Sequence, residues 1–145
     1  MAITDDGDFK QAVDDLSRAA QRLLAARFVE NVLELGKDAR LKGVVNAAKR
    51  SDITEDELAL AFQSAKAASV DSYTQCGHQC DWDSQAGHFV AQAALACLKP
   101  EPGAAWEAAT HARMARTCAS IAGGSGTDNS EALAQYRIVT EFLKS

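Results

Sequence analysis

Proline and aromatic residues are scarce in this sequence: two prolines occur among 145 residues, and aromatic residues make up 6%. The scarcity of proline leaves long helices unbroken, because proline lacks an amide hydrogen and its ring clashes with the preceding turn. Alanine is abundant instead, and it forms helices best because it loses no side-chain entropy in them. Alternating strand patterns are lacking beyond a few residues. The sequence therefore predicts an all-α fold, a compact alanine-rich bundle of about six helices in one domain spanning 1–145.

A long apolar run and an excess of positive charge are lacking as well. No run approaches the ~20 apolar residues that a helix needs to cross a bilayer, so no membrane association is expected. The start, from Met1 to Asp8, is acidic and precedes no apolar segment, unlike a secretory signal. We therefore expect a cytoplasmic location, with four free thiols in place of a disulfide framework. The net charge of −5 lacks the basic surface that neutralises phosphates, so nucleic acid is not an expected partner.

Apolar residues recur at helical spacing along most of the chain. The first stretch, from near Asp8 to Leu35, is predicted either as one long helix or as two helices that break near Arg27. Further helices are predicted over 38–50, from Thr54 to Tyr73, over 84–98, over 104–122 and from Asp128 or Asn129 onward. The helix over 84–98 is apolar nearly all round, so we expect it to be the central and most buried one.

The start of the helix at Thr54 is the most sharply defined boundary. Thr54 and Glu57 form a capping-box pattern, in which the threonine hydroxyl accepts from the glutamate amide and the carboxylate binds the threonine amide. The apolar positions of this helix are Leu58, Ala61, Phe62, Ala65, Ala68 and Tyr73. Asp81 or Asp83 is expected to cap the helix that follows.

Cysteine and histidine gather in one short segment: Cys76, His78 and Cys80 stand together, and His88 follows. Thiolates and imidazoles are ligands that Zn²⁺ prefers, so these four residues are candidate zinc ligands. The segment lacks the second ligand pair at the characteristic distance found in structural zinc sites. The alternative is a polar loop with partly buried thiols, and no cofactor is then expected.

Polar residues interrupt two apolar helix faces. Ser84, His88 and Gln92 are spaced four apart and form a narrow stripe on the predicted central helix. On the next helix Glu107 and His111 fall among apolar residues, and a glutamate at this spacing can raise the pKa of the histidine. If the two helices pack antiparallel, His88, Glu107 and His111 become candidates for general acid/base catalysis. The alternative is an ordinary i,i+4 pair that contributes a few tenths of a kcal/mol.

Motifs of nucleophilic catalysis and of phosphate binding are lacking. No serine stands in a Gly-x-Ser-x-Gly setting, and the glycine-rich stretch 123–127 lacks the Lys-Ser/Thr of a phosphate-binding loop. Trp106 projects beside Arg113 on the polar face of its helix. There it serves either as an anchor for a protein partner or as a contact with a neighbouring helix.

The stretch from Asp52 to about Arg116 resembles small all-helical proteins described as immunity proteins of bacterial toxin systems. The resemblance rests on Ile53-Thr54-x-x-Glu57, on the alanines at 61, 65 and 68, and on Ala86-Gly87-His88-x-Val90-Ala91-x-Ala93. It covers under half of the chain, and the segment from Cys76 to Asp83 departs from the pattern as an insertion. The resemblance implies a protein that binds and neutralises a bacterial toxin.

With no coherent catalytic set in the sequence, we expect a non-enzymatic helical domain that binds a protein partner, as an immunity-like or regulatory protein. One alternative is a metal-binding protein that uses the segment from Cys76 to His88. The other is an acid/base enzyme that uses His88, Glu107 and His111.

Overall fold

The computed structural model describes residues 3–76 and 81–145, and over these ranges the chain is helical and contains no strand. The elements of these ranges are α1 (Asp6–Asp14), α2 (Arg18–Asn31), the short 3₁₀ helix η1 (Leu33–Leu35), α3 (Arg40–Ala48), α4 (Glu55–Cys76), α5 (Trp82–Cys97), α6 (Ala104–Ala122) and α7 (Glu131–Lys144). The all-α prediction is confirmed, with seven α-helices in the described part of the chain in place of about six. Among these helices, none combines the length and the apolarity needed to cross a membrane.

The first stretch of the chain contains a break that the sequence analysis placed wrongly. The stretch is not one helix, and it does not break near Arg27, which lies within α2. The break falls between Asp14 and Arg18, where the Ser17 hydroxyl accepts a hydrogen bond from the amide of Ala20 at 3.2 Å. The Gln21 amide closes the end of α1 by donating to the carbonyls of Val13 and Leu16. Both sides of the break are therefore capped by side chains.

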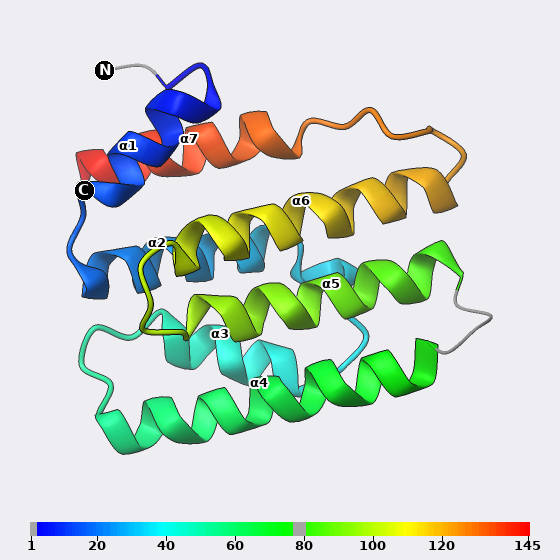
Figure 1. The fold of residues 1–145 in the computed structure, drawn as a ribbon, viewed down its shortest axis with the longest axis horizontal. Coiled ribbons are helices and arrows are strands. Elements are labelled where there is room, and N and C mark those ends of the chain that lie inside the picture. The colour runs from blue at the N-terminus through cyan, green and yellow to red at the C-terminus, as the bar shows by residue number, and fades with distance from the viewer. Residues whose placement is uncertain (1–2, 77–80) are drawn as a thin grey trace.

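The helices lie in two layers (Figure 1). α4, α5, α6 and α7 lie side by side with alternating direction, and α1 packs beside α7. The second layer contains α2 and η1, which lie behind α5 and α6 in this view, and α3, which lies behind α4 and α5. α5 is central, as predicted, because it packs against α4 and α6 on its two sides and against α2, α3 and η1 behind. α4 forms one edge of the layer and packs mainly against α3 and α5.

Alanine fills the seam between α5 and α6. The buried alanines of the two helices are Ala86, Ala91, Ala93, Ala94, Ala96, Ala104, Ala105, Ala108, Ala109, Ala112 and Ala115. Side chains this small let two helices approach closely, so that their backbones and methyl groups are in continuous contact. Larger apolar groups, including Phe9 and Phe28 with ring centroids 5.5 Å apart, fill the space between the layers and beneath α1.

The helix starts follow the expected capping chemistry closely. The hydroxyl of Thr54 accepts from the amide of Glu57 at 3.1 Å, and the Glu57 carboxylate accepts from the amide of Thr54 at 3.2 Å, which confirms the capping box. Of the two candidates for α5, Asp81 is the cap, since it accepts from the amide of Ser84 at 2.8 Å. α7 begins at Glu131, slightly later than expected, with the Asn129 side chain accepting from the Glu131 amide.

The alanine seam predicts that added volume will be costly at its centre. Replacing Ala112, which is fully buried, by leucine should lower the free energy of unfolding by about 1–3 kcal/mol, because the helices must move apart or the side chain must leave its preferred rotamer. The same change at the exposed Ala122 of α6 should alter it by less than about 0.5 kcal/mol. Urea unfolding of both variants tests this, and equal losses would contradict a close-packed seam.

Candidate functional site

His88 lies on α5 with both ring nitrogens engaged. Its Nδ1 lies 2.7 Å from the Ser72 hydroxyl of α4, and its Nε2 lies 2.9 Å from the side-chain nitrogen of Gln92. An amide nitrogen can only donate, so Nε2 accepts and the proton of the neutral ring is on Nδ1, which donates to Ser72. The Ser72 hydroxyl in turn donates to the carbonyl of Ser69 at 2.9 Å. Neutral His88 thus joins α5 to α4 through a hydrogen-bonded chain in which each proton has an acceptor.

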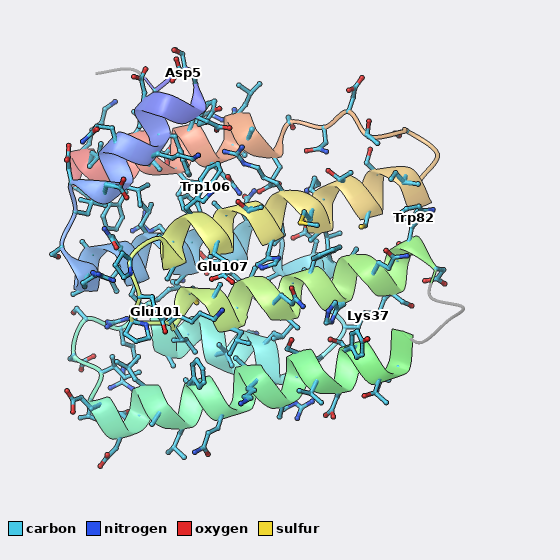
Figure 2. The ribbon with its side chains drawn as sticks, viewed as in Figure 1. Asp5, Lys37, Trp82, Glu101, Trp106 and Glu107 are labelled. Carbon is cyan, nitrogen blue, oxygen red and sulfur yellow. The ribbon has the colours of Figure 1, made fainter. Side chains whose placement is uncertain are left out.

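His111 lies on α6 and is the less satisfied of the two histidines. Its Nε2 is 3.8 Å from a carboxylate oxygen of Glu107, which is too long for a hydrogen bond. That carboxylate instead binds the ammonium of Lys99 at 3.0 and 3.3 Å, and Glu107 lies between α5 and α6 in Figure 2. The Nδ1 of His111 is buried and has no hydrogen-bond partner within the described residues. Glu107 and His111 are therefore neighbours, as the i,i+4 spacing predicts, but the carboxylate of Glu107 binds Lys99 and not the imidazole.

Burial holds both imidazoles in the neutral form. The pKa of His88 lies below its ordinary value of 6.5, first because of burial and then because of the positive charge that His111 would carry. Burial also lowers the pKa of His111, an effect that Glu107 opposes and Lys99 reinforces. At neutral pH both rings are therefore uncharged, and the expected rise in the His111 pKa caused by Glu107 is outweighed by desolvation.

Four aromatic side chains form a row across α4, α5 and α6. Ring centroids are 5.9 Å apart between Tyr73 and His88, 6.1 Å between His88 and Phe89, and 6.1 Å between Phe89 and His111. His88 faces Ser72 of α4, and in the described residues no hydrogen bond or ring contact joins it directly to Glu107 or His111 of α6. The Phe89 ring stands between the two imidazoles, stacked on His111 with an interplanar angle of 22°. A proton relay from His88 to His111 is not formed in this arrangement, because an apolar ring separates them.

The proposed zinc ligands fall largely outside the described residues. His78 and Cys80 lie in the segment 77–80, which is outside them, and of Cys76 only the backbone, at the end of α4, is described. In residues 3–76 and 81–145, no group of three or more His, Cys, Asp or Glu side chains is arranged to hold a metal ion. The fourth proposed ligand, His88, has both nitrogens occupied by Ser72 and Gln92. Zinc binding by the cysteine segment stays a prediction.

Trp106 and Cys97 both have structural roles. Trp106 lies on the side of α6 that faces α1 and α7 (Figure 2), where its ring meets Phe9 edge-on at 5.8 Å. The ammonium of Lys10 lies 4.2 Å from the centre of the same ring. Trp106 therefore makes the contact with a neighbouring helix that was one of its two interpretations. Cys97 is a buried thiol that donates to the carbonyl of Ala94, and burial raises its pKa to about 12, so it is unreactive.

The outer face of α4 is a feature that the sequence pattern did not reveal. Tyr73 was grouped with the apolar positions of its helix, yet it is 72% exposed, and Leu60 and Val70 are 66% and 55% exposed. The alanines at 61, 65 and 68 face inward and are buried. Beside Leu60, a groove of about 360 Å³ runs between α3 and α4, with Gly43, Val44, Ala47, Ile53 and Ala61 in its lining. We call Leu60, Val70 and Tyr73 the α4 outer face and this cavity the α3–α4 groove.

Comparison with known proteins identifies no relative from which a function could be inferred. No protein-family model, curated protein or solved structure matches this chain significantly. The resemblance to immunity proteins therefore stays a prediction from the sequence. The candidate sites are those that the geometry itself defines, namely the histidine pair of α5 and α6, the α4 outer face and the α3–α4 groove.

The two neutral histidines predict a pH-dependent stability. The unfolded chain takes up protons at these groups near pH 6.5, whereas the folded chain does so only at lower pH, so the unfolded state binds more protons in between. Their contribution to stability is complete above about pH 6.5 and is lost as the pH falls through the folded-state values. We expect urea unfolding to give a lower free energy at about pH 5.5 than at about pH 7.5.

A double variant separates the histidines from other titrating groups. His88→Gln combined with His111→Gln should reduce the difference between the two pH values, whatever the change in stability at the higher pH. The carboxyl groups with lowered pKa, such as Asp6 and Asp38, titrate below this window and remain in both proteins. An undiminished pH dependence in the double variant would contradict the assignment.

Proposed function

We propose that this chain is a helical protein-binding domain, with the α4 outer face and the α3–α4 groove as its contact surface. The exposure of Leu60, at 66% on the rim of an apolar groove, is the observation that carries the proposal. Large apolar side chains that gather on one face typically mark an interaction site. Burying a leucine side chain against a partner contributes about 1.5–3 kcal/mol, which makes Leu60 the natural anchor.

Gly43 supports the same surface from the other side of the groove. It lies inside α3, where glycine costs about 0.5–1 kcal/mol relative to alanine. A Cβ atom placed at this position would meet nothing within 4 Å in the described structure, so packing within those residues does not require glycine. A glycine there leaves room for the backbone of a partner to approach closely.

The rim of the groove is polar and carries ion pairs between largely exposed side chains. Arg40 forms ion pairs with Asp38 and Asp71, and Arg50 with Asp52 and Glu57. A polar rim around an apolar centre is the usual composition of a protein interface. The rim also limits the width of the apolar strip, which suits an elongated partner segment that lies along α3 and α4.

An amphipathic helix with basic residues near one end fits this surface best. Its apolar side would lie in the groove against Leu60, as in other helix-in-groove complexes. Glu55 and Asp56, in the first turn of α4, form no ion pair with any described residue and lie at one end of the groove. Their charges favour positive residues on the neighbouring end of the partner helix. An immunity-like or regulatory protein would use such a surface to hold its partner.

Two matched aspartate variants test the proposal. Leu60→Asp should lower the affinity for the partner by at least about tenfold, because the charge would have to be buried in the interface. Leu133→Asp changes a leucine of α7 with a similar exposure of 59% and should have no effect. The variants are compared by quantitative mass spectrometry of proteins retained from a lysate of the source cell.

Photo-crosslinking provides the direct test of position. Benzoylphenylalanine at Leu60 or Val70 should yield a discrete adduct with the same protein that the Leu60→Asp variant fails to retain. Benzoylphenylalanine at Leu133 should not yield that adduct. A protein that is retained equally by both aspartate variants, or that crosslinks equally from α7, would contradict a contact surface on α4.

A further inference from the structure

A second cavity, of about 300 Å³, lies between α4, α5 and the segment that joins η1 to α3. Its polar lining comes from all three elements: Lys37, Asp38, Ser72, Gln75, Ser84 and His88. Lys37 is seen between the ribbons of α4 and α5 in Figure 2. The apolar part of the lining consists only of small residues, Ala39, Gly87 and Ala91. This cavity shares no lining residue with the α3–α4 groove.

Small residues keep this space open. A Cβ atom at Gly87 would lie 3.3 Å from the Cγ of Lys37 and 3.7 Å from its backbone nitrogen. Glycine at this position therefore lets the segment after η1 lie directly against α5, which forms one wall. The methyl groups of Ala39 and Ala91 are too small to fill the space that remains. Its volume is at the lower end of the range of about 300–1,000 Å³ that is typical of ligand sites.

Several polar groups of the lining already form hydrogen bonds within the protein. The Asp38 carboxylate accepts from Nε of Arg40 at 2.9 Å and from its terminal nitrogen at 2.6 Å, so its charge is neutralised. The Ser72 hydroxyl gives its proton to the Ser69 carbonyl and accepts from His88. The backbone amide of Ser84, at 2.8 Å, and then its hydroxyl donate to the Asp81 carboxylate, and these bonds lower the pKa of Asp81. The oxygens of Ser72 and Ser84 can therefore only accept from a ligand.

The donors that remain are Lys37 and Gln75. In the described part of the chain, the Lys37 ammonium forms no ion pair or hydrogen bond, although its charge helps to lower the pKa of Asp81. The Gln75 side chain likewise has no hydrogen-bond partner in the described ranges. The cavity thus offers the Lys37 ammonium and the Gln75 amide nitrogen as donors, and the Gln75 carbonyl and two hydroxyl oxygens as acceptors.

We propose that this cavity binds a small carboxylate that carries a hydroxyl group of its own. The carboxylate accepts from Lys37 and from the Gln75 amide, and the ligand hydroxyl donates to the oxygen of Ser72 or Ser84. A carboxylate without a hydroxyl satisfies only the donors of the site. A neutral polyol can accept from the donors and donate to the acceptors through its hydroxyl groups, but it leaves the lysine charge unmatched. The ligand carboxylate matches the lysine charge, and the ligand hydroxyl supplies the proton that the oxygens of Ser72 and Ser84 can accept.

Amide NMR titration with matched pairs of probes tests the proposal. Lactate and propionate differ by one hydroxyl group, as do glycolate and acetate, and glycerol supplies hydroxyls without a charge. Lactate and glycolate should shift the amide signals of Lys37, Gln75 and Ser84 saturably. Propionate and acetate should bind about tenfold more weakly, which corresponds to the loss of one hydrogen bond, and glycerol should produce no saturable shift.

Two variants and a control locate the binding. Lys37→Met should abolish the saturable shifts, whereas Lys42→Met, an exposed lysine of α3 outside the cavity, should preserve them. Ala91→Leu should fill the space and also abolish binding, with the dispersion of the spectrum reporting whether this variant is folded. Absence of saturable shifts with every carboxylate, or equal shifts in Lys37→Met, would overturn the proposal. Equal affinities for lactate and propionate would overturn the role of the ligand hydroxyl.

Discussion

The close approach of α5 and α6 is the constraint on which the rest of this structure depends. The seam consists of alanines such as Ala93, Ala108 and Ala112, all fully shielded from solvent. A single alanine buries little area, so the seam is stabilised by many short contacts that exist only while the helices stay close. Aromatic side chains have no room there and lie at its open edge, where Phe89 stacks on His111. The row of rings across α4, α5 and α6 is a consequence of this seam.

The layer formed by α4, α5, α6 and α7 has two edges, and different interactions hold the helix at each. α7 is fastened by buried polar groups: Glu131 binds Arg116 at 3.0 Å and Asn31 at 2.7 Å, and Gln135 binds Arg113 at 2.7 Å. Such groups strongly penalise any other position of the helix, since moving it would leave a buried charge unpaired. α4, at the opposite edge, is held through small inward-facing alanines and leaves large apolar residues outside. The two edges are therefore held in different ways, by buried polar pairs at α7 and by small apolar contacts at α4.

The chemistry of the histidines follows from burial more than from their neighbours in sequence. His88 is neutral and fully hydrogen-bonded, and it links α5 to α4 beside the second cavity. Glu107 stands four residues before His111, as the sequence shows, but its carboxylate is drawn to Lys99 from the end of α5. The spacing of Glu107 and His111 follows from the sequence. The positions of Lys99 beside Glu107 and of Phe89 beside His111 depend on how α5 and α6 are aligned.

The sequence by itself determined the helical class, the start of α4 and the extent of α6. These depend on interactions within one or two helical turns, such as the contact between Thr54 and Glu57, and so they are encoded locally. The tertiary structure alone decided that the first stretch breaks before Arg18, that Tyr73 and Leu60 face outward, and that a cavity opens beside Gly87. In each case the outcome depends on which distant helix covers a given face, and no spacing along the chain specifies that.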